Sequence, residues 1–377
     1  MTDGGDGGDS TTDGGTQPSD GGSPTNDGGT TLTALTISGG NGFACALVSG
    51  GAQCWGDNLF GTLGTGNRIS SAAPVHVLGL TTGVQGITTG ASSIHACAVV
   101  QGSALCWGDN SYGQLGNNST TQANAPIQVA GLTSGVQAIG TGNAHTCALV
   151  SGGVWCWGDG SHGRLGNNTT VGSHVPVPVT GLTGGVSAIA VGEAHACALV
   201  SGAMQCWGDG YAGELGTTSV WESATPIPVS RVTGNVQAMA AGRSFTCAIV
   251  DGGAFCWGSN SSGQLGGNKQ VTNTPKPIPV LGLTSGVQAI SAGDFHGCAV
   301  VNASAWCWGA NADGQLGNGT TDIGLAPVQV AGLTAGVSAI AAGTKATCAI
   351  VSGGAQCWGS NVPSGSKVPV AVGPLAP

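Results

Sequence analysis

The stretch His145–Gly158 reads HTCALVSGGVWCWG and decides the fold. Two short runs of apolar, β-branched and aromatic residues flank Ser151-Gly152, which predicts two antiparallel strands joined by a two-residue turn. The spacing from Cys147 to Cys156 recurs seven times, uses all 14 cysteines of the chain, and starts anew every 50 to 52 residues. The seven pairs are Cys45 with Cys54, Cys97 with Cys106, Cys147 with Cys156, Cys197 with Cys206, Cys247 with Cys256, Cys298 with Cys307, and Cys348 with Cys357. A fixed period near 50 residues indicates a propeller or another repeat array.

Each repeat unit holds about four strand-like runs. In the third unit they are residues 136–139, 147–150, 156–158 and 176–179, separated by Gly, Asn and Pro. Such runs between turn residues predict short strands. Seven copies of a four-stranded antiparallel sheet suit a radial arrangement. We therefore predict an all-β, seven-bladed β-propeller over residues 32–377.

The hairpin register predicts one cross-strand disulfide in each blade. With Ser49-Gly50 as the turn, Cys45 and Cys54 lie directly opposite each other at a non-hydrogen-bonded position. Cα atoms at such a position are ~4.5 Å apart, which a disulfide tolerates. Seven disulfides are expected in an oxidising compartment.

A metal site is the alternative interpretation of the cysteines. His145 shares a strand face with Cys147, and Cys156 lies opposite, so the three side chains are plausible zinc ligands. However, the histidine position is Phe or Ala in three units, whereas both cysteines are present in all seven. The cysteines do not depend on the histidine, and we predict neither a metal nor another cofactor.

The residues that follow the cysteines are also constant. Ala follows the first cysteine and Trp follows the second in every unit. We expect the alanine where sheets crowd near the axis. The tryptophan points away from its cysteine along the strand, so we expect it to fill the space between neighbouring blades.

Two motifs carry a family resemblance. The units read G-x-x-H-x-C-A-L-V-x-x-G and then W-G-x-N-x-x-G-x-L-G, as in Trp107–Gly116 and Trp308–Gly317. This resembles the regulator of chromosome condensation repeat family, of the bacterial secreted or surface type, and the likeness runs from Leu35 to Val372. The resemblance implies a seven-bladed propeller more firmly than a function. A kelch propeller is disfavoured because its glycine doublet with following Tyr and Trp is absent.

Residues 1–31 differ from the rest of the chain. They consist almost wholly of Gly, Asp, Thr and Ser, with six aspartates and no Lys, Arg or aromatic residue. Such a segment buries too little apolar surface to offset its ordering entropy, so we predict a disordered tether. A tether of this kind follows the lipid-modified cysteine of many bacterial surface lipoproteins. No export signal is visible after Met1; the disulfides nevertheless favour an extracellular or cell-surface location, and a cytoplasmic protein without a leader is the alternative.

Charge argues against nucleic-acid binding. The chain has 8 Lys and Arg against 17 Asp and Glu, a formal net charge of −9, and no basic stretch. Proteins that bind nucleic acids need clustered positive charge. No apolar run reaches the ~20 residues of a transmembrane helix.

Residues for catalysis are scarce. The histidines His95, His145, His195 and His296 occupy equivalent positions. We interpret each as holding a backbone carbonyl at its blade, with a functional site in the channel as the alternative. Glutamate occurs only at positions 193, 214 and 222, so a general acid and base pair is hard to assemble. We predict that the protein is not an enzyme, with a propeller lyase or hydrolase as the alternative.

The loops between the L-G pair and the proline of each unit vary, whereas the strands scarcely change. We expect these loops to cluster on one rim and to bind a partner. Trp221 is the most unusual residue there, because it lies outside the repeat pattern. A tryptophan beside a charge is a plausible anchor for a partner, and a loop folded on its own blade is the alternative. The candidate partner-binding residues are Arg68, His174, Trp221, Glu222, Lys269 and Lys276. The seventh unit lacks the G-x-L-G loop, which predicts a notch in the rim.

These features together predict a monomeric binding scaffold that holds a protein or a glycan through its loop rim. A structural or adhesive module without a discrete ligand is the alternative. The sequence does not identify the partner.

Overall fold

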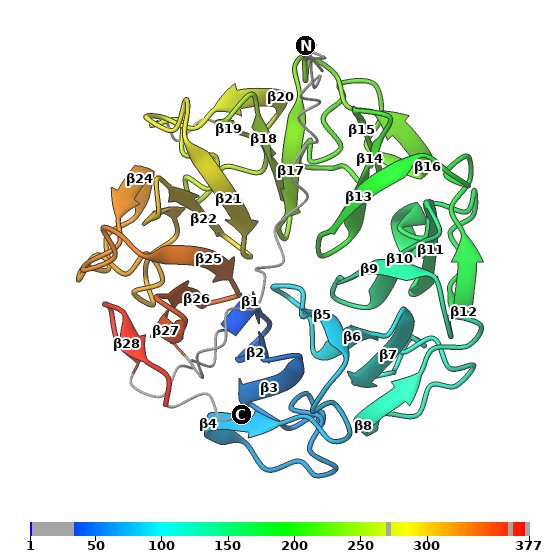
Figure 1. Ribbon diagram of the computed structural model, residues 1–377. Helices are drawn as coiled ribbons and strands as arrows, with labels where there is room; N and C mark the ends of the chain where they lie inside the picture. The colour runs from blue at the N-terminus through cyan, green and yellow to red at the C-terminus, as the bar shows by residue number, and fades with distance from the viewer. Residues whose placement is uncertain (2–33, 269–272, 361–364, 374–377) are drawn as a thin grey trace. The chain divides into compact units, whose positions relative to one another are not determined.

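The structure, a computed structural model, describes Met1 and residues 34–268, 273–360 and 365–373. Its strands form seven four-stranded antiparallel sheets, each with its strands in chain order. The sheets stand around a common axis as blades 1 to 7 (Figure 1). The predicted seven-bladed all-β propeller is therefore confirmed. The prediction of a disordered tether at residues 1–31 falls almost wholly outside the described residues.

In each blade the first strand lies nearest the axis and the fourth forms the outer edge (Figure 1). The first strands are β1 (Ala34–Gly39), β5 (Val84–Thr88), β9 (Val136–Thr141), β13 (Val186–Val191), β17 (Val236–Ala241), β21 (Val287–Ala292) and β25 (Val337–Ala342). The second strands are β2 (Phe43–Val48), β6 (His95–Val100), β10 (His145–Val150), β14 (His195–Val200), β18 (Phe245–Val250), β22 (His296–Val301) and β26 (Ala346–Val351). The third strands are β3 (Gly51–Gly56), β7 (Ser103–Gly108), β11 (Gly153–Gly158), β15 (Ala203–Asp209), β19 (Gly253–Gly258), β23 (Ser304–Gly309) and β27 (Gly354–Gly359). The fourth strands are β4 (Ser71–His76), β8 (Ala123–Gln128), β12 (Ser173–Pro178), β16 (Glu222–Pro228), β20 (Thr274–Pro279), β24 (Gly324–Gln329) and β28 (Val370–Ala371), and a short 3-10 helix, η1, covers Ser161–Gly163.

The central hairpin of each blade has the predicted register. Cys45 pairs with Cys54 across β2 and β3, and the turn residues Ser49 and Gly50 both have positive φ. The same pairing recurs in every other blade, between the second and third strands.

All seven predicted disulfides are present, with Cα atoms 4.0 to 4.1 Å apart. From blade 1 to blade 7 the bonds join Cys45 to Cys54, Cys97 to Cys106, Cys147 to Cys156, Cys197 to Cys206, Cys247 to Cys256, Cys298 to Cys307, and Cys348 to Cys357. The cysteines are buried, so each bond joins the two middle strands of its blade inside the core.

The core lies between the blades. The disulfide and Leu47 of blade 1 share a buried cluster with Ala98 and Trp107 of blade 2. The alanine that follows the first cysteine therefore lies beneath the disulfide of the preceding blade rather than near the axis, because its side chain shares a sheet face with the tryptophan. The tryptophan fills the space between blades, as predicted, and all seven are at most 1% exposed.

Each inter-blade tryptophan except the first also donates a hydrogen bond. The indole N–H of Trp107 donates to the carbonyl of Thr62 at 2.8 Å, in the G-x-L-G loop of the preceding blade. The same bond, at 2.8 to 3.1 Å, is made by Trp157, Trp207, Trp257, Trp308 and Trp358. The loop motif and the tryptophan therefore form one joint between successive blades.

The joint between blades 7 and 1 is different. Ile37 and Trp55 of blade 1 pack against Ile350 of blade 7, but Trp55 Nε1 is buried and has no partner among the described residues. Blade 7, which adjoins Trp55, is the unit without the G-x-L-G sequence that supplies the acceptor carbonyl at the other joints. The predicted notch involves residues 361–364, which lie outside the described part of the chain, and it stays a prediction.

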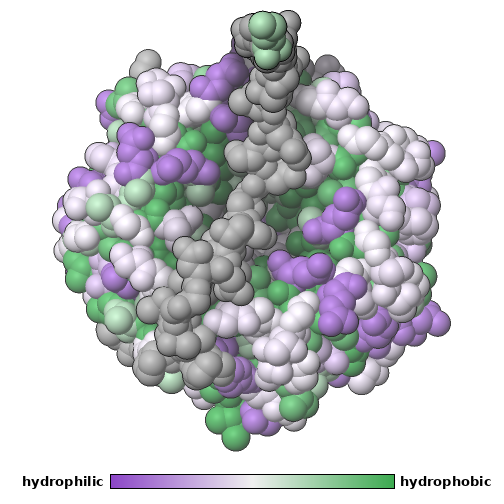
Figure 2. Space-filling view, viewed as in Figure 1, coloured by the Kyte–Doolittle hydropathy of each residue, from purple (hydrophilic) through white to green (hydrophobic). Residues whose placement is uncertain are grey.

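The surface is weakly polar. Only 7% of the residues are charged, and Figure 2 shows strongly hydrophilic side chains as separate patches among pale and apolar ones. Among the described residues, no helix has the length and apolar character that a membrane crossing requires.

Candidate functional site

The candidate rim residues do not form one cluster. Arg68 of blade 1 donates to the side chains of Gln122 and Asn124 in blade 2, at 3.0 and 3.3 Å. Trp221 and Glu222 lie in blade 4. The set therefore spans several blades. His174 belongs to β12 of blade 3 and Lys276 to β20 of blade 5, whereas Lys269 lies outside the described residues.

Trp221 lies at a pocket between the rims of blades 4 and 5, which we call the blade 4–5 pocket. Its volume is about 720 Å³. Tyr211 and Trp221 form its aromatic walls and are 61% and 69% exposed. The other lining residues are Gly210, Ala212, Gly213, Thr217, Thr218, Val220, Asn260, Ser261, Asn273 and Pro275.

The pocket opens where a backbone bond between rims is missing. In blade 3, the N–H of Asn168 donates to the carbonyl of Ala224 in blade 4 at 2.8 Å. We call this bond the rim clasp. Equivalent bonds of 2.8 to 3.0 Å link Gly66 to Asn124, Asn118 to His174, Asn268 to Leu325 and Gly319 to Lys367.

The donor of the rim clasp needs a left-handed backbone. Asn168 has φ 64° and Gly66 has φ 83°, and the other three donors are also Asn or Gly with positive φ. Blade 4 has Thr218 at this position, and a β-branched residue is strongly disfavoured there. Thr218 has no positive φ and, within the described residues, makes no such bond to Pro275. The rims of blades 4 and 5 are therefore left apart.

A second restraint is missing on the same loop. In blade 2 the amide of Asn110 donates to the carbonyls of Ser119 and Thr121 and so holds the rim loop down. Gly210 occupies this position in blade 4, and only its backbone N–H contacts the loop, donating to the carbonyl of Trp221 at 2.8 Å. The loss of the side-chain clamp leaves the Trp221 side chain free to stand out from the rim.

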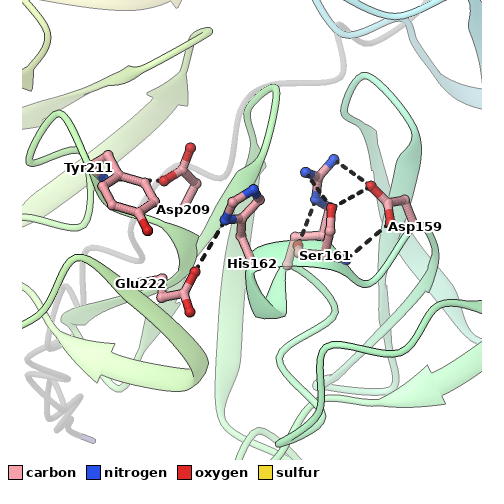
Figure 3. A network of polar contacts seen from close by, with 7 residues as sticks. Asp159, Ser161, His162, Asp209, Tyr211 and Glu222 are labelled. Carbon is pink, nitrogen blue, oxygen red and sulfur yellow. Dashed lines mark hydrogen bonds and ion pairs between the residues drawn. The ribbon is translucent and has the colours of Figure 1, made fainter.

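Tyr211 is braced from blade 3. His162 Nδ1 lies 3.1 Å from Glu222 Oε2, and the His162 ring meets the Tyr211 ring edge to face at 6.1 Å between centroids (Figure 3). Arg164 holds the other side of η1, since it donates to Ser161 at 3.0 Å and contacts Asp159 at 3.2 Å. The tyrosine wall of the pocket therefore rests on a polar network that spans two blades. Sequence reasoning missed His162 and Tyr211, because neither belongs to the repeat pattern.

A buried carboxyl lies behind the pocket wall. Glu214 is 1% exposed, and its Oε2 accepts the N–H of Ala212 at 2.8 Å. Burial raises the pKa of Glu214 to about 8, and the negative charge of Asp209 adds to the rise. In blade 2 the equivalent residue is Gln114, whose amide donates to Asp109 at 2.7 Å. Glu214 can replace that donor only when it is protonated.

The four equivalent histidines are inter-blade contacts. His195 Nε2 lies 2.9 Å from the hydroxyl of Thr246 in the next blade, and that hydroxyl donates to the carbonyl of Glu214. The expectation that each histidine holds a carbonyl directly is therefore wrong, since a threonine hydroxyl stands between. His95 and His296 repeat the contact. His145 makes none, and both of its ring nitrogens are buried without a partner among the described residues.

Burial favours the neutral form of these four histidines. Burial lowers the pKa of His95 to about 3 and those of His195 and His296 to about 4, and it holds the pKa of His145 well below its usual value. Within the described ranges, no three His, Cys, Asp or Glu side chains are grouped so that they could hold a metal ion.

An insertion at the axial channel, which sequence reasoning also missed, contacts blades 6 and 7. The loop after β5 is two residues longer than in the third unit, which explains the 52-residue spacing between the first two cysteine pairs. Ser92 donates to Asp294 of blade 6 at 2.5 Å, and Thr344 of blade 7 donates to the carbonyl of Ala91 at 2.6 Å. The remaining channel has a volume of about 230 Å³.

The motifs match a known family model. The regulator of chromosome condensation (RCC1) repeat matches residues 101–149, 151–199, 201–249, 251–300 and 302–350, more than half of the chain. A curated relative is the human E3 ubiquitin-protein ligase HERC2, which is 34% identical over 105 residues, 27% of this chain. The matched part spans only 2% of HERC2.

Solved structures with the same fold include two from eukaryotes. Yeast RCC1 (Prp20), in a crystal structure with Kap60, has a TM-score of 0.74 at 20% identity and covers 86% of this chain and 83% of its own. Human WBSCR16 has a TM-score of 0.72 at 21% identity, with 83% and 85% covered. At these identities the likeness shows the fold alone.

Proposed function

Because the chain belongs to the regulator of chromosome condensation repeat family, whose propellers are commonly protein-binding scaffolds, we propose that it is a non-enzymatic scaffold that binds its partner at the blade 4–5 pocket. In the yeast structure, the similar RCC1 propeller is bound to Kap60. The partner of this chain is a separate question, since rim loops differ between relatives.

One observation carries the proposal: two large aromatic side chains stand exposed at one pocket. Tyr211 and Trp221 are the most exposed aromatic residues of the described chain. Aromatic anchors of this kind dominate binding energy when a partner buries them. Both lie where the rim clasp is replaced by an opening, so the pocket is a local departure from the repeat.

We also propose that the protein works outside the cytosol, at a cell surface or in the extracellular space. Seven disulfides, with no free cysteine among the described residues, support an oxidising compartment. The bacterial origin predicted from the tether finds no support in the relatives named above, which are eukaryotic.

The test compares two double variants of the immobilised full chain. The first, Trp221→Ala with Tyr211→Ala, removes both pocket walls. The second, Ile69→Ala with Tyr112→Ala, removes one side chain from the rim of blade 1 and one from the rim of blade 2. These two residues are 74% and 56% exposed. Each is incubated with the extracellular fraction of the source cells, and retained proteins and glycans are quantified.

We expect the wild type and the Ile69 and Tyr112 variant to retain the same components, and the Trp221 and Tyr211 variant to lose them at least tenfold. Equal retention by all three would place binding elsewhere. No saturable retention by the wild type would favour a structural module, and turnover of a retained component would favour an enzyme.

A further inference from the structure

We propose that the blade 4–5 pocket binds an uncharged carbohydrate chain; this inference rests on the proposed binding function and names its ligand class. The described lining contains no Asp, Glu, Lys, Arg or His. A pocket without charge offers nothing to compensate the desolvation of a charged ligand. The described lining therefore favours a neutral ligand.

Both wall residues, Tyr211 and Trp221, carry exposed aromatic rings. An aromatic ring has a negative face, and it attracts the weakly positive C–H groups on one side of a pyranose ring. Tyr211 and Trp221 also have few rotatable bonds, so ordering them on binding costs little entropy. The edge-to-face contact with His162 reduces that cost further for Tyr211.

The floor and rim supply polar groups of both kinds. The lining residues include Thr217, Thr218, Ser261 and Asn273, whose hydroxyl and amide groups can donate and accept. Sugar hydroxyls also donate and accept, so a set of mixed groups suits them better than a set of donors alone. The combination of stacking walls with mixed hydroxyl and amide groups is the observation that selects a carbohydrate.

The size fits a short run of linked sugars. A volume of about 720 Å³ lies within the ~300–1,000 Å³ of small-ligand sites. A folded protein domain would have to contact the rim outside the pocket. On the blade 4 side, the carboxylate of Glu222 beside Trp221 is engaged by His162 at 3.1 Å.

A proline-rich peptide is the competing ligand, because aromatic-lined grooves also bind polyproline helices. Such a peptide presents carbonyl acceptors at regular spacing along an extended groove. The blade 4–5 pocket is confined to two neighbouring rims, and its lining beyond the aromatic walls carries acceptors as well as donors. These features favour the carbohydrate.

The probes are soluble neutral polysaccharides, namely a β-glucan, a xylan, a galactomannan and a glycol chitin, with polygalacturonate and a proline-rich peptide for comparison. Retardation of the full chain in native gels containing each polysaccharide gives the affinity, and peptide binding is measured by fluorescence anisotropy. The variants are Trp221→Ala, Tyr211→Ala and Thr218→Asn, with Tyr112→Ala and Ile69→Ala as matched controls.

We expect at least one neutral polysaccharide to retard the wild type and both controls, and Trp221→Ala or Tyr211→Ala to weaken binding at least tenfold. Thr218→Asn should also weaken binding, because asparagine adopts the left-handed backbone that restores the rim clasp to Pro275 and closes the pocket. Circular dichroism and the thermal midpoint check that each variant is folded.

Three results would overturn the inference: no retardation by any neutral polysaccharide, equal retardation of the Trp221 and Tyr211 variants, or stronger binding of polygalacturonate or the peptide. If one of these occurs while a protein is still retained through Trp221 and Tyr211, the ligand class is wrong and the proposed binding function stands. If retention in that experiment also fails, both are wrong.

Discussion

His195 Nε2 lies 2.9 Å from Thr246 Oγ1, across the boundary between blades 4 and 5. The Thr246 hydroxyl donates to the carbonyl of Glu214, which also accepts the indole N–H of Trp257. The hydroxyl has a single hydrogen, and it points at the carbonyl. The hydroxyl can therefore only accept a hydrogen bond from the histidine, so the neutral ring carries its hydrogen on Nε2. A threonine occurs at this position only when the preceding blade has a histidine.

One histidine breaks this rule. His145 faces blade 4, where the position of the threonine is occupied by Ala196, and neither ring nitrogen has a partner within the described chain. Leaving a buried polar group unpaired costs ~1–3 kcal/mol. This defect gives a direct prediction about stability.

Ala196→Thr should stabilise the protein by about 1 kcal/mol, because the new hydroxyl pairs with His145 and donates to the carbonyl of Arg164. The expected rise in the thermal midpoint is roughly 1 to 2 °C for a chain of this size. Ala96→Thr is the control, because it faces Phe43 rather than a histidine. Calorimetry that finds Ala196→Thr no more stable than Ala96→Thr would contradict the relay.

The inter-blade tryptophans should differ in how much they contribute to stability. Trp107→Phe loses the bond to the Thr62 carbonyl, whereas Trp55→Phe loses no hydrogen bond to any described residue. The first substitution should therefore cost about 1–3 kcal/mol more than the second. The two sites are closely matched, since both tryptophans are at most 1% exposed and both lie opposite an alanine, Ala96 and Ala44. Urea unfolding of both variants measures the difference. Equal losses would mean that Trp55 has an acceptor after all.

The fold could be predicted because repetition multiplies weak signals. A single hairpin with cysteines is ambiguous, but seven copies indicate the number of strands in each repeat. A two-residue turn at Ser49-Gly50 then places Cys45 directly opposite Cys54, as the structure shows. The inter-blade position of the tryptophan followed from alternation along the strand. The position of the alanine could not be predicted in the same way. Alternation assigns its side chain to a face of the sheet but does not say which residues of the neighbouring blade that face contacts.

The site was harder to predict because it depends on departures from the repeat. Trp221 was found as an outlier, but the pocket arises from Thr218 and Gly210, which replace residues whose role is visible only as hydrogen bonds. The contact of Ser92 with Asp294 joins positions 202 residues apart and needed the closed ring to be seen. Comparison of the units at the position of Thr218 could have revealed the missing rim clasp. The 52-residue spacing could have revealed the insertion that contains Ser92.

The disulfides should resist reduction in the folded state. The cysteines are buried, so a thiol reductant reaches them only when a blade opens. We expect no maleimide labelling of the native protein, little labelling after dithiothreitol alone, and labelling of all 14 cysteines after dithiothreitol in urea. Replacing Cys147 and Cys156 together by alanine should cost roughly 2 to 3 kcal/mol of unfolding free energy. Extensive labelling of untreated native protein would refute the disulfide assignment and, with it, the proposed oxidising location.

Glu214 makes stability depend on pH. Its folded pKa of about 8 exceeds the ordinary value of 4.5, so the folded protein binds the proton more tightly than the unfolded chain does. The resulting contribution to stability is fully present below pH 4.5 and is lost as the pH rises towards 8. Glu214→Gln keeps the shape, resembles Gln114 of blade 2 and cannot ionise. The variant should therefore match the wild type at about pH 4.5 and exceed it by roughly 2 to 4 kcal/mol at about pH 8.5.

The control for this prediction is Glu214→Gln paired with Gln114→Glu, which places the carboxyl beside Asp109 instead and should restore the pH dependence. Urea unfolding between about pH 4.5 and about pH 8.5 measures all three proteins, because the shift in pKa acts over this interval. Parallel stability profiles for Glu214→Gln and the wild type would show that Glu214 stays ionised in the fold.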